Sequence, residues 1–285
     1  MIVFLDDRFV PEAEAVVSVF DRSFLYGDGL FEAIRLYQGK LFRWEQHFER
    51  LAAGAQELRI QVPQTAGAIR NAATELWRQN DSPADAVIRL TLSRGIGPRG
   101  YSPTGANKPR LIMALHPLPA IEPRKSFRLI TSSLKVAADD SLSKYKTCNK
   151  LHQVLARAEA DQSGAQEALM INTKGHVAEA TSSNLFWVSS GVICTPPLQS
   201  GALSGITRAV VMELASSLRI PAAEVETTPA KLLNAEGIFL SLTTLELIEV
   251  IELDGQGVSR SRIIPNLQIA YRELVGKELG LHPPC

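Results

Sequence analysis

The segment Lys146-Thr147-Cys148-Asn149 stands at the centre of the sequence, just before a predicted helix. Apolar residues recur along this helix at one-face spacing, namely Leu151, Val154, Leu155 and Ala158. The spacing predicts that the helix buries this stripe and ends near Ser163-Gly164. Lysine attacks an aldehyde when its surroundings make it less basic, although most lysines are solvated surface residues. Lys146, at the helix entrance, is therefore a candidate nucleophile that would hold an aldehyde cofactor as a Schiff base.

A carboxylate follows within the next strand-rich stretch. Glu179 ends an alternating segment and precedes Thr181-Ser182-Ser183-Asn184. Paired with a pyridine nitrogen, such a carboxylate would keep the ring protonated and electron-withdrawing. The alternative is an exposed glutamate at the end of a strand.

Two further segments carry hydrogen-bond donors. A glycine-bearing loop from Gly201 opens a helix at Ile206, whose first backbone N–H groups favour an anion. Thr207 adds a hydroxyl there, or simply caps the helix. Thr243 and Thr244 follow a short apolar strand, where they donate further hydrogen bonds or form a plain turn.

The N-terminal part contains a strand and a helix with polar residues of interest. The alternation of residues 30–37 places Phe31 and Arg35 on one face and Glu32 on the other. Residues 44–58 have helical periodicity, with His47 and Arg50 at the edge of the apolar stripe. On the residues alone, these two side chains are interpreted as a partly exposed histidine and a surface arginine.

Residues 95–100 match the pattern GxGxxG. Pro98 and the following Tyr-Ser-Pro-Thr-Gly exclude a helix beginning inside the motif, which a dinucleotide-binding loop requires. Arg99 and Tyr101 on this loop are candidates for gripping a substrate carboxylate, with a plain glycine-rich turn as the alternative.

Composition limits the possible partners. Among the 285 residues, Lys plus Arg and Asp plus Glu each number 30, so the net charge suggests no nucleic-acid or membrane-surface partner. We expect no nucleic-acid, membrane or metal partner: no apolar run approaches a membrane span, and the cysteines lack ligand spacing. The odd number of cysteines, Cys148, Cys194 and Cys285, and an N-terminus unlike a signal peptide indicate a reducing cytoplasmic setting.

The order of predicted elements indicates the fold class. Strands alternate with helices in both halves of the chain, which favours an α/β or α+β protein of two domains. Residues 116–125 are rich in proline and resemble a linker. The expected division is a small N-terminal domain over 1–118, a linker over 119–125 and a larger C-terminal domain over 126–285, which carries Lys146.

Taken in order, these motifs resemble one family over about residues 3–275. The carriers are Tyr-Gly-Asp-Gly-Leu-Phe-Glu from Tyr26, His47-x-x-Arg50-Leu51, Lys146-Thr-x-Asn149, Glu179-x-x-Ser-Ser-Asn-Leu-Phe, Gly205-Ile-Thr-Arg and Thr243-Thr-x-Glu. The chain resembles the fold type IV pyridoxal-phosphate enzymes, the class IV aminotransferases. The resemblance implies a homodimer with a small N-terminal α/β domain, a larger barrel-like C-terminal α/β domain and pyridoxal 5′-phosphate as cofactor.

The resemblance also implies residue roles. Lys146 matches the Schiff-base lysine that also moves the proton between Cα and C4′, and Glu179 matches the partner of the pyridine nitrogen. Leu203 matches the apolar residue behind the ring. The residues that match the phosphate cup are Arg50, Ile206 through its backbone N–H, Thr207 and Thr243.

The family contains different reactions on one cofactor site. An aminotransferase would move an amino group between an amino acid and a 2-oxo acid, with Arg99, Tyr101 and Arg35 as candidates for holding a carboxylate and Phe31 and Thr244 beside the substrate. The alternative is aminodeoxychorismate lyase, which forms 4-aminobenzoate and pyruvate in folate synthesis. Lys150 and Arg99-x-Tyr101 depart from the tyrosine of many branched-chain enzymes and from the Arg-x-His of many D-specific enzymes. The aminotransferase is the expected activity, of the branched-chain or D-amino-acid type.

Overall fold

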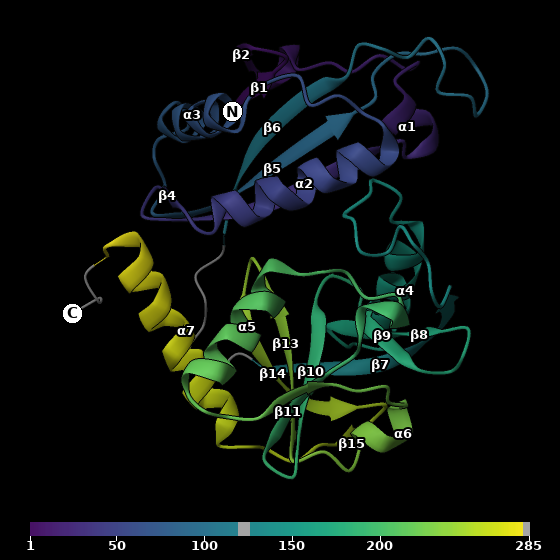
Figure 1. Ribbon diagram of the computed structural model, residues 1–285, viewed down its shortest axis with the longest axis vertical. Helices are drawn as coiled ribbons and strands as arrows, with labels where there is room; N and C mark the ends of the chain where they lie inside the picture. The colour runs from purple at the N-terminus through teal and green to yellow at the C-terminus, as the bar shows by residue number, and fades with distance from the viewer. Residues whose placement is uncertain (119–125, 282–285) are drawn as a thin grey trace. The chain divides into compact units, whose positions relative to one another are not determined.

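The computed structural model describes residues 1–118 and 126–281, and this part of the chain forms two compact units (Figure 1). The first unit comprises residues 1–118 together with Tyr145–Asn149, and the second comprises residues 126–144 and 150–281. The linker expected at 119–125 lies outside the described residues. One expectation is wrong: Lys146 belongs to the first unit and not to the C-terminal domain, because its segment is hydrogen-bonded to a strand of the first sheet.

The first unit is a six-stranded sheet in the order β2-β1-β6-β5-β3-β4, with every neighbouring pair antiparallel. Its strands are β1 (Ile2–Leu5), β2 (Arg8–Pro11), β3 (Gly29–Tyr37), β4 (Lys40–Leu41), β5 (Asp85–Ser93) and β6 (Arg110–Pro117). Its helices are η1 (Glu12–Glu14), α1 (Arg22–Tyr26), α2 (Trp44–Leu58) and α3 (Ala66–Arg78). The periodicity of residues 44–58 predicted α2 with the bounds that the structure shows.

Helices α2 and α3 lie along the first sheet and supply its apolar cover (Figure 1). Leu51 and Ala55 of α2 and Ile69 and Leu76 of α3 are buried at spacings of four and seven residues, as an inward-facing helical stripe requires. Strand β3 is buried on both faces, with only Ala33 partly exposed. The polar side chain of Glu32 therefore needs partners inside the unit.

The second unit is a mixed sheet that curls into a half-barrel, in the order β12-β11-β10-β13-β14-β7-β8-β9, with β15 paired to β14. Its strands are β7 (Ser126–Val136), β8 (Glu167–Asn172), β9 (Val177–Ala180), β10 (Asn184–Ser189), β11 (Val192–Thr195), β12 (Ala222–Glu224), β13 (Gly237–Leu242), β14 (Glu246–Leu253) and β15 (Gln256–Gly257). Its helices are α4 (Leu151–Gln162), η2 (Leu198–Ser200), α5 (Ile206–Ser217), α6 (Pro229–Leu232) and α7 (Ile263–Leu279). Helices α5 and α7 pack on each other and on β13 and β14 (Figure 1).

The orientation of helix α4 differs from the prediction. The apolar stripe predicted to be buried is on the surface: Leu151, Val154 and Leu155 are 64%, 61% and 47% exposed. The helix instead packs through Ala156 and Ala160, which are fully buried against β7 and β8. Small residues allow the helix backbone to approach the sheet closely, so the large side chains point outward.

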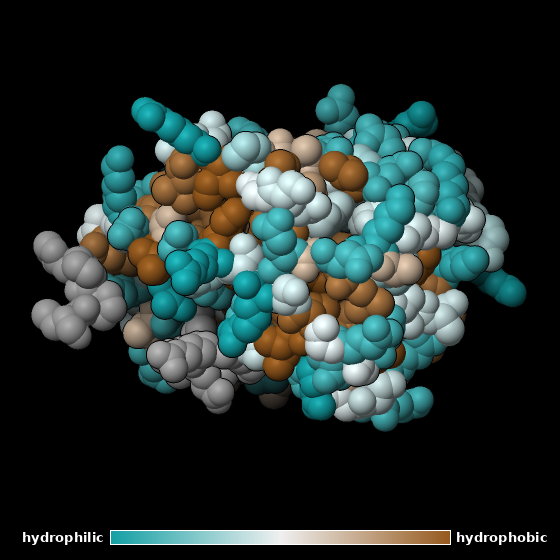
Figure 2. Space-filling view, turned by 90° about the horizontal axis from the view of Figure 1, so that it is seen from below, coloured by the Kyte–Doolittle hydropathy of each residue, from teal (hydrophilic) through white to brown (hydrophobic). Residues whose placement is uncertain are grey.

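Apolar side chains also reach the surface elsewhere, in patches between hydrophilic ones (Figure 2). In the first unit, large apolar residues between 16 and 25 are exposed, namely Val16, Val17, Val19, Phe20, Phe24 and Leu25. In the second unit, Leu218, the residue that follows α5, is 43% exposed. Among the described helices, none is long and apolar enough to span a membrane.

Candidate active site

The segment around Lys146 is attached to β3 through its backbone. The carbonyl of Lys146 accepts from the N–H of Phe31 at 2.9 Å, and the N–H of Cys148 donates to the carbonyl of Gly29 at 2.9 Å. Thr147 forms an isolated antiparallel bridge with Leu30. Helix α4 begins only at Leu151, so an extended segment, and not a helix entrance, holds Lys146 in place.

A glycine makes this attachment possible. Gly27 ends α1 with φ of 67°, and an added Cβ would lie 3.1 Å from Cβ of Asn149. A side chain here would be strained by its backbone angle and would crowd the segment that carries Lys146. The Tyr26-Gly27-Asp28-Gly29 motif is thus a close-packing turn.

The aromatic ring of Phe31 lies next to two cations. Nζ of Lys146 is 4.7 Å from the ring centroid, and Cζ of Arg89 is 3.8 Å from the same centroid. Arg89 comes from β5, where Thr91 pairs with Phe31 and Arg89 pairs with Ala33. Partial burial lowers the pKa of the Arg89 guanidinium. Arg89 was not among the residues predicted from the sequence, although it is the single arginine within the apolar stretch Val87-Ile88-Arg89-Leu90.

Glu32, His47 and Arg50 form a buried cluster behind this surface. Glu32 accepts from Nε and an Nη of Arg50 at 2.8 and 2.6 Å, and lies 2.7 Å from Nδ1 of His47. Glu32 and His47 are buried, and the Arg50 side chain is only 9% exposed. The interpretation of His47 and Arg50 as surface residues is therefore wrong: Glu32 on the facing strand draws both side chains inward.

The charges of this cluster follow from burial and pairing. Burial raises the pKa of Glu32, but the charge of Arg50 and the hydrogen bonds from His47 and Arg50 outweigh it and hold the pKa at about 2. Burial lowers the pKa of His47, and the positive charges of Arg50 and Lys146 lower it further against the opposing effect of Glu32. At neutral pH the cluster therefore contains an ionised carboxylate, a guanidinium and a neutral imidazole that donates from Nδ1 to the carboxylate.

Arg35 is enclosed elsewhere on β3. It is 4% exposed, forms an ion pair with Asp85 at 3.7 Å and has its guanidinium 4.2 Å from the ring centroid of Tyr37. These contacts stabilise the end of β3. Its role toward a substrate stays a prediction.

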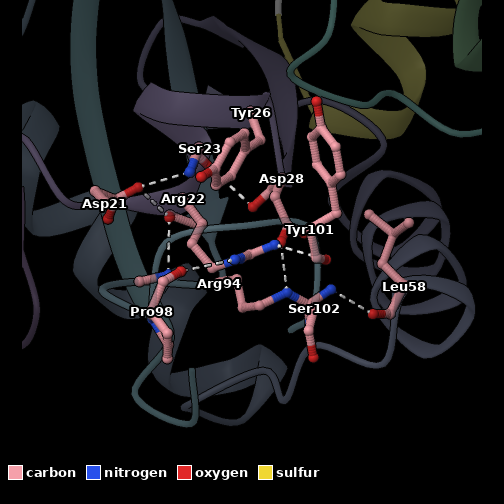
Figure 3. A network of polar contacts seen from close by, with 12 residues as sticks. Asp21, Arg22, Ser23, Tyr26, Asp28, Leu58, Arg94, Pro98, Tyr101 and Ser102 are labelled. Carbon is pink, nitrogen blue, oxygen red and sulfur yellow. Dashed lines mark hydrogen bonds and ion pairs between the residues drawn. The ribbon is translucent and has the colours of Figure 1, made fainter. Parts of the chain in front are cut away.

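Two buried arginines organise the start of the loop between β5 and β6 (Figure 3). Nε of Arg22 and Nε of Arg94 both donate to Oδ2 of Asp28, at 2.8 and 2.7 Å. Burial raises the pKa of Asp28, but hydrogen bonds and charge from Arg94 and Arg22 outweigh it and hold the pKa below its usual value. Arg94 also donates to the carbonyls of Leu58 and Arg59 at the end of α2.

The same network holds the loop that carries Arg99 and Tyr101. The Arg22 guanidinium donates to three loop carbonyls, those of Pro98, Gly100 and Tyr101, at 3.4, 2.9 and 3.2 Å. The Tyr101 ring contacts Tyr26 edge-on, yet the residue is 89% exposed. Arg99 is exposed as well. No helix begins within the described residues 95–100, which confirms that the glycine pattern belongs to a loop.

In the second unit, Glu179 lies near the end of β9. Its Oε2 accepts from the N–H of Leu203 at 2.9 Å and lies 3.4 Å from Nδ2 of Asn184. Asn184 also donates to the carbonyl of Leu203, at 2.9 Å. The interpretation of Glu179 as an exposed strand-end residue is wrong, because it is partly buried and bound to the 203–205 loop.

Helix α5 begins immediately after this loop. Its N-cap is Gly205, which has no side chain to cap the first turn. Thr207 in this turn is buried. Asn184 pairs with Ser241 across β10 and β13, so the turn with Thr243 and Thr244 lies at the same end of the sheet. The second unit thus brings a carboxylate, the start of a helix and threonine hydroxyls to one end of the sheet.

Comparison with known proteins identifies the family. The sequence model described as amino-transferase class IV matches residues 29–253. A putative branched-chain-amino-acid aminotransferase of Methanocaldococcus jannaschii is 37% identical over 92% of this chain and 91% of its own length. A D-alanine aminotransferase of Staphylococcus epidermidis is 33% identical, with 92% of each chain covered.

Solved structures agree with the sequences. The branched-chain aminotransferase of Thermoproteus uzoniensis with norvaline has a TM-score of 0.91 and 33% identity, and the match covers 99% of this chain and 96% of that chain. A putative 4-amino-4-deoxychorismate lyase of Legionella pneumophila has a TM-score of 0.86 and 28% identity, with 92% and 96% covered. The named sequence relatives favour the aminotransferase over the lyase. The chain belongs to the class IV aminotransferase family and is an aminotransferase.

Proposed function

We propose that this aminotransferase uses pyridoxal 5′-phosphate to move the amino group of a branched-chain L-amino acid to a 2-oxo acid. The relative of highest identity described above carries a branched-chain name. Another solved branched-chain amino acid aminotransferase, with 31% identity and a TM-score of 0.90, is described as complexed with N-(5′-phosphopyridoxyl)-L-glutamate. The same enzyme is described with pyridoxamine 5′-phosphate.

The residues present fit this cofactor. In the first unit, Lys146 supplies an amine for the aldehyde, and Arg50 is a buried guanidinium suited to a phosphate. In the second unit, the start of α5 after Gly205 supplies backbone N–H groups from Ile206 and Thr207. Thr243 adds a hydroxyl, Leu203 an apolar side chain for the ring, and Glu179 a carboxylate for its nitrogen.

Each group has a defined chemical task. The cofactor, when bound, supplies an aldehyde that takes up the amino group and a ring that withdraws electrons from the bonds at Cα. Nζ of Lys146 would hold the aldehyde and, once released from it, would act as the base for the proton on Cα of the amino acid. Glu179 would keep the ring nitrogen protonated, and the acceptor 2-oxo acid would receive the amino group.

One observation carries the assignment most strongly. Lys146 and Arg89 approach the same ring of Phe31, at 4.7 and 3.8 Å from its centroid. An amine and a guanidinium near one aromatic ring suit a substrate that carries both an amino group and a carboxylate. We therefore propose Arg89 as a carboxylate-binding residue, together with Phe31 as its support. Arg99, Tyr101, Arg35 and Thr244 remain proposed substrate residues.

The surface of the chain supports a homodimer. Leu151, Val154 and Leu155 expose a helical apolar stripe, and residues 16–25 expose a second group of large apolar side chains. Exposed apolar groups of this kind are typical of surfaces that are covered in an assembly. The odd number of cysteines supports a reducing, cytoplasmic location.

A D-amino acid is the second candidate substrate. It is favoured by the D-alanine aminotransferases among the relatives. Against it, the chain has Arg99-x-Tyr101 where the resemblance leads to Arg-x-His in many D-specific enzymes.

The test is to add L- and D-amino acids singly to the protein loaded with pyridoxal 5′-phosphate, without any 2-oxo acid, and to follow the visible spectrum. Fast conversion to the pyridoxamine form by L-valine, L-leucine or L-isoleucine is the expected result. Lys146→Ala should abolish conversion, whereas Lys150→Ala is the matched control and should retain it. Conversion fastest with D-alanine would replace the substrate assignment, and full activity of Lys146→Ala would refute the site.

A further inference from the structure

Asn184 connects three parts of the second unit through one buried amide. Its Nδ2 donates to the Leu203 carbonyl at 2.9 Å and lies 3.4 Å from Oε2 of Glu179. The N–H of Leu203 donates to the same Oε2 at 2.9 Å. Asn184 is 5% exposed, so these contacts are shielded from water. The carboxylate, the loop and the first residue of β10 therefore form a closed ring of hydrogen bonds.

Gly205 adds the start of α5 to this ring. Its φ of −70° and ψ of 138° are accessible to any residue, so its backbone conformation does not require glycine. The available space does require glycine, because a Cβ at this position would lie 1.9 Å from Oδ1 of Asn184 and 3.1 Å from its Cγ. The glycine at the N-cap of α5 thus accommodates the amide of Asn184.

We propose that Asn184 is a positioning residue, which holds the Glu179 carboxylate and the N-terminus of α5 in fixed register. The inference rests on the proposed function, in which Glu179 pairs with the ring nitrogen and the start of α5 binds the phosphate. One side chain then sets the spacing between the group for the ring and the group for the phosphate. A rigid cofactor requires that spacing to be constant.

The chemistry of the amide suggests two different substitutions. Asn184→Ala removes the donor to Leu203 and leaves a buried carbonyl without that partner. Asn184→Asp keeps the volume but places an acceptor against the Leu203 carbonyl and the Glu179 carboxylate. We expect both variants to bind pyridoxal 5′-phosphate about 10-fold more weakly or worse, because a lost buried hydrogen bond corresponds to roughly that factor.

A spectroscopic readout separates positioning from loss of structure. Glu179→Gln should displace the absorption maximum of the bound cofactor, since it changes the partner of the ring nitrogen. The Asn184 variants should displace the maximum in the same direction. The control is Asn172→Ala, which removes another buried amide of this unit, donating to the Ser200 carbonyl at 3.1 Å. That variant should lower thermal stability without moving the maximum.

Gly205→Ala completes the experiment as a double-mutant cycle. Alone, it should weaken cofactor binding because its methyl group displaces Asn184. In the Asn184→Ala background the same change should have less than half that effect on a logarithmic scale, because the obstructing amide is gone.

Three outcomes would overturn the inference. The first is an absorption maximum and a cofactor affinity like those of the wild type in both Asn184 variants. The second is an equal displacement of the absorption maximum in Asn172→Ala. The third is an effect of Gly205→Ala on cofactor binding that is as large in the Asn184→Ala background as in the wild type. If wild-type protein itself fails to bind pyridoxal 5′-phosphate, the proposed function falls and the inference falls with it. Binding by wild type with unchanged variants refutes the inference alone.

Discussion

Replacing Glu32 with glutamine tests whether the cluster behind Phe31 is held together by a buried charge. Glu32 is 1% exposed and has a pKa of about 2, against 4.5 for an ordinary glutamate. At about 1.4 kcal/mol for each pKa unit, the fold favours its ionised form by about 3 kcal/mol. Glu32→Gln removes that charge and leaves the Arg50 guanidinium without its carboxylate. We expect the free energy of unfolding at pH 7 to fall by about 3 kcal/mol.

The pH dependence gives this prediction a sign. Because folding lowers the pKa of Glu32, the stabilisation is fully present above pH 4.5 and is lost as the pH falls toward about 2. Between about pH 7 and about pH 3.5 the wild type should lose about 1 kcal/mol from this group, while Glu32→Gln loses none from it. The gap between the two proteins should therefore narrow in acid.

The assay is urea unfolding at fixed protein concentration and several pH values, followed by circular dichroism. Glu45→Gln is the matched control, because Glu45 is an exposed partner of Arg70 on the same helix as His47 and Arg50. It should change stability by less than about 0.5 kcal/mol. A Glu32→Gln protein as stable as the control, or a gap that does not depend on pH, would refute the reasoning.

Three other substitutions test separate parts of the structure. Arg89→Leu should raise KM for the amino acid about 10- to 100-fold while leaving cofactor affinity unchanged, as steady-state kinetics and a cofactor titration would show; equal KM values would remove Arg89 from the site. Asp28→Asn leaves the buried Arg22 and Arg94 without their shared anion, so limited proteolysis should cut the loop at 95–109 much faster than in wild type, and unchanged cleavage would contradict the anchoring role. Leu155→Glu should shift sedimentation toward a monomer if α4 is covered in a dimer, whereas Leu218→Glu, at another exposed apolar site, should leave the assembly unchanged.

The periodicity of apolar residues predicted where helices lie better than it predicted which of their faces are buried. The spacing of Trp44, Leu51 and Leu58 was sufficient for the bounds of α2, because burial of a helical face repeats along the sequence. The spacing of Leu151 and Val154 predicted a helix equally well but not its exposed stripe. A pattern reports that a face is apolar, and only the tertiary structure determines what covers it.

The order of the motifs along the sequence pointed to candidate residues. Contacts between side chains of different strands and helices could not be predicted in this way. Lys146 and Glu179 were singled out because they stand beside turns and strand ends, and their roles stay predictions. Arg89 was not predicted, because its position beside Phe31 depends on the register of β3 and β5. The buried state of His47 was also missed, because it depends on Glu32 of a neighbouring strand.

The attachment of Tyr145–Asn149 to β3 has a consequence for how the protein is made. In chain order, the first unit is followed by β7 of the second unit, then by Tyr145–Asn149 of the first unit, and then by α4 of the second unit. During synthesis, the backbone contacts between β3 and Tyr145–Asn149 cannot form until residue 149 has emerged from the ribosome. Nascent chains that end before this point should therefore remain sensitive to protease, and those that extend beyond it should acquire resistance. A truncated gene product that stops at the proline-rich segment would lack both the lysine and the backbone partner of β3.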